Sequence, residues 1–135
     1  MYQYRIAPEH CAFIQENVQE LLDLGHIEPC TSDWRSPVLV VCKKDGKLQW
    51  VIDYCSLNNL IKDNTMPMQN ARELLECMAM GKKWSGLDCM DGYHQMWVDP
   101  PHHDHTAFAV PGIRGGLYQW IIMPFGLKGA PATFQ

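Results

Sequence analysis

Apolar residues near the N-terminus recur at helical spacing and predict an amphipathic helix. Pro8 and Glu9 suit its first turn, because proline fits there and an acid faces the positive end of the helix dipole. The apolar positions on one face are Cys11, Ile14, Val18, Leu21 and Leu22. Gly25 follows this pattern and is expected to end the helix.

The stretch VLVVCKKDGKLQWVIDY predicts a β-hairpin. Residues 38–42 are apolar and mostly β-branched, Asp45-Gly46 is a turn signal, and residues 48–54 form the expected returning strand. Lysines gather around the turn, at Lys43, Lys44 and Lys47. Residues 55–67, by contrast, show no regular pattern and are expected to be irregular.

The middle of the chain predicts a helix and then a short strand. Residues 70–80 have a helical pattern, with Asn70 as a candidate N-cap and Gly81 as a stop signal. Residues 82–87 predict a strand with Asp88 at its end. The dipeptide Asp91-Gly92 then predicts a turn.

The last third of the chain predicts two more strands and the start of a helix. The strands are expected in HTAFAVP and GLYQWIIMP, joined by GIRGG, and the helix in LKGAPATFQ. Helices combined with antiparallel strands in this order predict the α+β fold class.

Composition narrows the class of protein. The 135 residues suit one domain, and 47% hydrophobic with 19% charged residues is typical of a globular chain. The net charge of −4 argues against a dedicated nucleic-acid binder, although it leaves room for a local basic strip. The six cysteines form no Cys-x-x-Cys pair, and the N-terminus lacks an apolar leader. We therefore expect an intracellular protein, cytoplasmic or nuclear, with reduced thiols and no membrane partner.

Several segments, taken in order, resemble reverse transcriptases, and most closely those of the gypsy class of LTR retrotransposons. These segments are ELLDLGHIEPCTSDWRSPVLVVCKKDG, VIDYCSLNNLIKDNTMPM, SGLDCMDGYHQ, TAFAVP and MPFGLKGAPATFQ. The resemblance implies a partial right-hand polymerase fold over residues 1–135, comprising the fingers and the first part of the palm. Residues 1–80 and 107–120 would belong to the fingers, and 81–106 and 121–135 to the palm.

By this resemblance, Asp88 is a catalytic aspartate that binds two Mg²⁺ (or Mn²⁺) ions, assisted by the backbone carbonyl of Cys89. From the residues alone, Asp88 could instead cap the following turn. The metal role agrees with the preference of Mg²⁺ for carboxylate and phosphate oxygens. Two such ions activate the primer hydroxyl and neutralise the leaving pyrophosphate.

The resemblance also implies a nucleotide site. Tyr93 matches a steric gate against the 2′-hydroxyl, and Asp91 and Gly92 would offer backbone N–H groups to the triphosphate. Lys43 matches a lysine at the terminal phosphate, and Phe125 would line the nucleotide pocket. The expected partners are a deoxynucleoside triphosphate and an RNA or DNA template-primer, with Lys44 and Lys47 on the template side.

Two positions depart from the family pattern. Gln49 stands where the family usually has an arginine that holds the triphosphate, and Cys55 stands where an arginine supports the template. Neither replacement carries a positive charge, and glutamine cannot replace a bidentate guanidinium on phosphate.

The family's other catalytic aspartates lie in a Tyr-x-Asp-Asp turn, and no Asp-Asp pair occurs in this sequence. We therefore expect a polymerase fragment that is inactive alone and that would need the C-terminal remainder of the polymerase. The alternative is a domesticated or decayed remnant that binds nucleic acid or protein without catalysis.

The stretch DPPHHDH allows a metal-site hypothesis, because His102, His103 and His105 are close in sequence. A structural zinc site usually needs four ligands in tetrahedral geometry, and the resembling family carries a polar turn here. A polar turn is thus the favoured interpretation, and metal binding stays an open alternative. The tryptophans could stack on bases, but half-buried packing is the favoured role for most of them.

Overall fold

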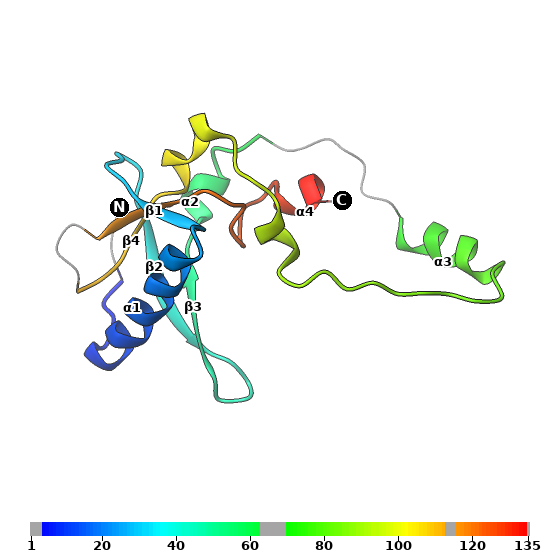
Figure 1. Ribbon diagram of the computed structural model, residues 1–135, viewed down its shortest axis with the longest axis horizontal. Helices are drawn as coiled ribbons and strands as arrows, with labels where there is room; N and C mark the ends of the chain where they lie inside the picture. The colour runs from blue at the N-terminus through cyan, green and yellow to red at the C-terminus, as the bar shows by residue number, and fades with distance from the viewer. Residues whose placement is uncertain (1–3, 63–69, 113–115, 135) are drawn as a thin grey trace.

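The computed structural model describes residues 4–62, 70–112 and 116–134. Its main body is a β-sheet with helix α1 (Pro8–Asp23) packed beside it (Figure 1). Residues 113–115 of the predicted connection GIRGG and residues 63–67 of the predicted irregular segment lie outside the described residues. Within the part that is described, no helix is both long and apolar enough to cross a membrane.

Helix α1 forms as the apolar spacing predicted. Proline stands at its first position, and Ile14 and Val18 on the expected face are buried. Gly25 follows the helix in the left-handed conformation, with φ at 68°, which a residue without a Cβ adopts at little cost. The turn there sends the chain directly into strand β1 (Ile27–Pro29).

The predicted hairpin is confirmed as strands β2 (Ser36–Cys42) and β3 (Leu48–Ile52), paired antiparallel from Val38 opposite Ile52 to Cys42 opposite Leu48. At its tip Gly46 has a φ of 80°, and the Lys47 N–H donates to the Asp45 carboxylate at 3.1 Å. The hairpin projects from the body of the molecule in Figure 1.

Among the described residues the strands form one five-stranded sheet in the order β1-β5-β4-β2-β3. Strands β4 (Phe108–Ala109) and β5 (Leu117–Trp120) pair antiparallel, as predicted, and β5 also pairs antiparallel with β1. The β2–β4 pair is parallel, so the sheet is mixed. The fold is α+β, as expected.

The hydrophobic core lies between α1 and the sheet and extends to the segment after β3. Phe108 is fully buried, and its ring lies near those of Trp50, Tyr118 and Trp120 at centroid distances of 5.8–6.1 Å. The other buried members of this cluster are Ile14, Val18, Ile27, Val38, Ile52, Tyr54, Leu57, Val110 and Ile122.

The segment after β3 is not wholly irregular, so that prediction is wrong in part. Residues Cys55–Asn58 form a short helix, α2. The Asp53 carboxylate accepts from the Cys55 N–H at 2.9 Å, and Leu57 is buried in the core. The N-cap residue Tyr54 makes no side-chain cap bond, so the bond from the Cys55 N–H to the preceding Asp53 side chain and the burial of Leu57 stabilise this helical turn.

Helix α3 (Ala71–Ala79) forms where predicted, and the Asn70 side chain caps it by accepting from the Arg72 N–H at 3.0 Å. All its side chains are exposed, and it lies apart from the sheet in Figure 1. The predicted strand at residues 82–87 is wrong: residues 83–89 are irregular and exposed. A strand needs a neighbouring strand for its backbone hydrogen bonds, and this segment has none among the described residues.

Short helices complete the fold. The 3₁₀ helices are η1 (Gly92–Gln95), η2 (Pro100–His102) and η3 (Asp104–Thr106), and the predicted last helix is α4 (Ala130–Phe134). Of the tryptophans, Trp120 is buried and Trp34 and Trp50 are half-buried, whereas Trp84 and Trp97 are 60% and 77% exposed.

Candidate nucleotide site

A hollow of about 390 Å³ lies where the hairpin, α1 and η1 approach one another. It contains four of the residues predicted for nucleotide binding: Lys43, Gln49, Asp91 and Phe125. The other lining residues are Phe13, Asn17, Glu20, Leu21, Leu24, His26, Leu48, Trp50, Val51, Ile52, His94, Trp120 and Pro124. The fold therefore brings together predicted residues that are far apart in the sequence.

The hairpin contributes the basic side of this hollow. The Lys43 N–H donates to the Lys47 carbonyl at 2.8 Å, and the Gly46 N–H donates to the Lys43 carbonyl at 2.9 Å, so the tip has a fixed shape. Lys43, Lys44 and Lys47 are all exposed, but only Lys43 is among the residues that line the hollow.

On the side of the hollow opposite the hairpin, the chain turns at a residue in the left-handed conformation. Asp91 has φ 46° and ψ 49°, a conformation that aspartate tolerates better than most residues. Its carbonyl accepts from the His94 N–H at 2.8 Å, which starts η1. The predicted turn at Asp91-Gly92 is confirmed, and it aligns Asp91 and His94 along the hollow.

Aromatic rings surround this turn. The Tyr93 ring lies 5.2 Å from Phe125 and 5.5 Å from Phe134, measured between centroids. A Cβ at Gly92 would come within 2.6 Å of the Phe134 ring, so a larger residue here would require that ring to move. The gate candidate Tyr93 is thus held between two rings from the C-terminal segment.

Sequence reasoning missed His26 and His94, which lie against each other at 5.7 Å between ring centroids. His94 also lies 4.9 Å from Phe125 and 5.4 Å from Trp120. Burial lowers the pKa of His94, and nearby Asp91 partly opposes that shift. The one available signal was the position of His94 directly after Tyr93 in the same motif.

The predicted catalytic position lies outside the hollow. Asp88 and Cys89 are exposed in the irregular segment before η1. Within residues 4–62, 70–112 and 116–134, no group of three or more His, Cys, Asp or Glu side chains could hold a metal ion. One carboxylate does not make a site for a hard divalent cation, so these residues do not fit a bound metal pair.

Cys55, the predicted template-side position, is exposed at the start of α2. Its neighbour Asp53 accepts from the Cys55 N–H and, at 2.9 Å, from the Tyr4 hydroxyl. These interactions, led by the hydrogen bond with Cys55, lower the pKa of Asp53. Cys55 is not among the residues that line the hollow.

Curated proteins of similar sequence are large polyproteins. The chain is 36% identical over 138 residues to the retrovirus-related Pol polyprotein from transposon 297 of Drosophila melanogaster. It is 34% identical over 132 residues to the genome polyprotein of Petunia vein clearing virus. These alignments cover 98% and 95% of this chain but only 13% and 6% of the relatives.

A solved structure shows the same fold. The protease–reverse transcriptase of prototype foamy virus superposes with a TM-score of 0.82 at 30% identity, covering 99% of this chain and 18% of that protein. The family model described as reverse transcriptase (RNA-dependent DNA polymerase) matches residues 31–135, which is most of the sequence. This chain therefore belongs to the reverse transcriptase family.

Proposed function

We propose that this chain is the nucleotide-binding part of a reverse transcriptase of the gypsy class, comprising the fingers and the first part of the palm. The observation that carries the proposal is the hollow that joins Lys43, Gln49, Asp91 and Phe125. Residues 1–80 and 107–120 are assigned to the fingers, and 81–106 and 121–135 to the palm.

In this proposal the hollow receives a deoxynucleoside triphosphate. Lys43 contacts the terminal phosphate, the Asp91 and Gly92 backbone N–H groups face the triphosphate, and the Tyr93 ring excludes a 2′-hydroxyl. Phe125 packs beside Tyr93 and supports that ring. The other charged lining residues are Glu20 and Asp91, so without an arginine at position 49 the phosphates meet little positive charge.

In the same proposal, the template-primer lies along the hairpin. Membership of the family implies binding of a nucleic-acid template-primer, and the exposed Lys44 and Lys47 are proposed to contact its phosphates. Cys55 is assigned to the template side, where it adds no charge. An intracellular site of action, cytoplasmic or nuclear, belongs to the same proposal.

Reverse transcriptases use a divalent metal, and Asp88 with the Cys89 carbonyl is our candidate for this chain's share of the metal ligands. The described residues form no group of three or more His, Cys, Asp or Glu that could hold a metal ion, and we propose that further carboxylates come from the C-terminal remainder of the polymerase. That remainder would also cover large apolar side chains that lie within 14 positions of Asp88 in the sequence. They are Leu74, Leu75, Met78, Met80, Trp84, Leu87, Met90 and Trp97, each at least 46% exposed.

The alternative of a remnant that binds without catalysis is not favoured, since the similar curated proteins are Pol and viral polyproteins. The direct test of the proposal is a graft. Residues 1–135 replace the matching segment of the foamy virus protease–reverse transcriptase, and primer extension is measured on poly(rA)·oligo(dT) with Mg²⁺ or Mn²⁺.

We expect extension by the graft, loss of extension in its Asp88→Asn variant, and no extension by the isolated chain. The Asp88→Asn variant is nearly isosteric and serves as the matched control. A folded graft without activity, or one whose activity survives Asp88→Asn, contradicts the proposal. Extension by the isolated chain that Asp88→Asn abolishes would show that this chain completes the site itself.

A further inference from the structure

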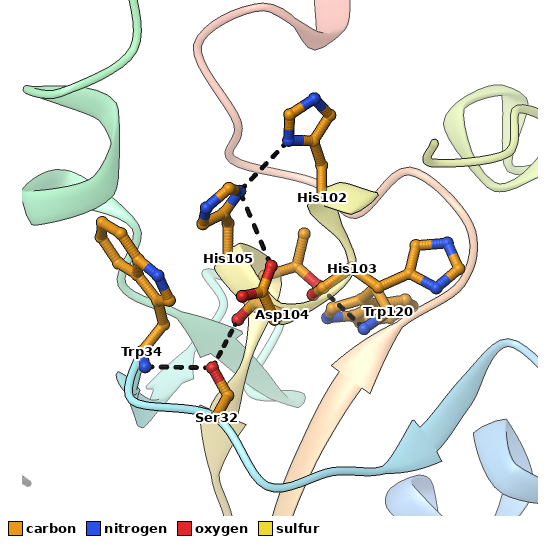
Figure 2. Close-up of polar contacts among 8 residues, drawn as sticks. Ser32, Trp34, His102, His103, Asp104, His105 and Trp120 are labelled. Carbon is orange, nitrogen blue, oxygen red and sulfur yellow. Dashed lines mark hydrogen bonds and ion pairs between the residues drawn. The ribbon is translucent and has the colours of Figure 1, made fainter. Parts of the chain in front are cut away.

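Two imidazoles lie together on the turn that precedes β4, away from the residues of the nucleotide site. His102 ends η2 and His105 lies in η3, three positions later. Side chains three residues apart in 3₁₀ geometry lie on the same face. The two Nδ1 atoms accordingly face each other at 3.4 Å, as Figure 2 shows, and the rings stack at 5.4 Å between centroids.

The turn is anchored to the core. The Tyr54 hydroxyl donates to the Thr106 carbonyl at 2.8 Å, and the Trp120 N–H donates to the Thr106 hydroxyl at 2.9 Å. The Thr106 hydroxyl in turn donates to the His103 carbonyl at 2.6 Å. Thr106 is only 3% exposed, so these bonds hold the backbone beneath His105 in one place.

A second set of contacts orients His105 from the side. The Ser32 hydroxyl donates to the Asp104 carbonyl at 2.9 Å and accepts from the Trp34 N–H at 3.0 Å (Figure 2). The Trp34 ring then packs edge-on against His105 at 5.0 Å. The histidine pair thus sits on a supported scaffold rather than on a free loop.

The spacing of the two nitrogens matches that of two ligands on one ion. With Zn–N bonds of about 2.0–2.1 Å, two ligands at a tetrahedral ion lie about 3.3–3.4 Å apart. A direct N–H···N bond between the rings at 3.4 Å would be longer than the usual range for hydrogen bonds. The pair is therefore better spaced for a shared ion than for a shared proton.

His103 has a different role, although it is adjacent in sequence. Its Nε2 lies 2.8 Å from the Val98 carbonyl, which can only accept, so Nε2 carries the proton. Its Nδ1 faces Glu28 at 3.9 Å. Neither nitrogen is directed at the His102–His105 pair in Figure 2.

We propose that His102 and His105 bind one first-row transition-metal ion of the kind imidazole prefers, Zn²⁺ or Cu²⁺. The Asp104 carboxylate, 3.8 Å from the His105 Nδ1, adds negative charge beside the pair. The described residues form no ready group of three ligands, so water or an outside ligand fills the remaining positions. Mg²⁺ does not compete, since it takes oxygen ligands.

The test is calorimetric titration of the full chain with Zn²⁺ alone, after its thiols are blocked, because free cysteines also bind this ion. One equivalent is expected to bind, and His102→Gln and His105→Gln should each weaken binding at least about tenfold. The controls His103→Gln and His10→Gln should leave it unchanged. Circular dichroism checks that each variant folds.

Copper gives an independent readout. Cu²⁺ bound at His105 should quench the fluorescence of Trp34, and Trp34→Phe, which keeps an aromatic ring beside His105, should remove that quenched component. Undiminished Zn²⁺ binding in His102→Gln and His105→Gln, or no stoichiometric binding by the wild-type chain, would overturn the proposal. Either result leaves the polymerase assignment untouched, because the two sites share no residue.

Discussion

Apolar side chains are buried in the sheet and exposed in the segment from residue 70 to residue 90. Phe108 and Val38 are fully buried, whereas Leu87 is 99% and Met80 is 90% exposed. The sheet buries its apolar face because α1 and the segment after β3 cover it, and a domain needs such a second layer. Helix α3 and the residues around Asp88 have no such cover among the described residues.

This difference separates the two halves of the proposed active site. Gln49 and Trp120 are fixed by strand pairing, and Phe125 by its ring contacts with Tyr93 and His94. Asp88, in contrast, lies in an exposed irregular segment. The proposed nucleotide pocket can therefore form from this chain, while the geometry of the proposed metal site depends on parts that the remainder of a polymerase would supply.

The largest expected effect contrasts one core residue with one exposed residue. Phe108→Ala should lower the free energy of unfolding by about 3–5 kcal/mol, through lost burial and a cavity. Leu87→Ala should change it by no more than about 0.5 kcal/mol. Urea denaturation measures the free energy of unfolding of both variants. An equal decrease in the two variants would contradict the difference between the buried sheet and the exposed segment.

A gain of function should follow from restoring charge to the pocket. Gln49→Arg should tighten deoxynucleoside triphosphate binding about tenfold, because a charge-assisted hydrogen bond to phosphate is added. Gln49→Lys should gain less, since a lysine cannot bind bidentately. Fluorescence titration measures both, and unchanged affinity in Gln49→Arg would place the triphosphate elsewhere.

Removing the N-cap of α3 tests whether this helix unfolds independently of the sheet. Asn70→Ala removes the bond to the Arg72 N–H and should cost the helix about 1 kcal/mol. Because α3 is exposed throughout, we expect less helical circular dichroism but an unchanged urea midpoint. A shifted midpoint would mean that α3 unfolds together with the sheet.

The smallest effect concerns pH. Burial lowers the pKa of His94 below its ordinary 6.5, so the unfolded chain takes up this proton at higher pH than the folded chain. The stability due to neutral His94 is therefore present above about 6.5 and is lost as the pH falls towards the folded pKa. His94→Phe, which keeps an aromatic ring between Phe125 and Trp120, should flatten this dependence. An unchanged slope would assign it to other groups.

Local signals predicted the elements that local physics determines. The hairpin followed from a β-branched run and Asp45-Gly46, and α1 followed from apolar spacing and Gly25. Helix α2 was missed because its stability depends on Leu57 reaching a core formed by distant residues. The parallel β2–β4 pairing is a long-range contact that no local pattern encodes.

For the candidate site the resemblance proposed six residues, of which Gly92 and Tyr93 are not among those that line the hollow. The resemblance also proposed Lys43, Gln49, Asp91 and Phe125, which line one hollow, and their role in nucleotide binding stays a prediction. It could not reveal that His26 and His94 lie against each other there, because contacts between distant side chains depend on the tertiary fold. The strand before Asp88 was wrongly predicted since a strand is stable only beside a partner strand.

Hydrogen–deuterium exchange, read by mass spectrometry, tests the central claim most directly. In the isolated chain, amides of β2, β3 and β5 should be protected, and those of residues 83–89 should exchange as fast as an unfolded peptide. In the graft that supplies the remainder of a polymerase, residues 83–89 should become protected. Protection of residues 83–89 in the isolated chain equal to that of β2 would contradict the account, because Asp88 would then be held in place by this chain alone.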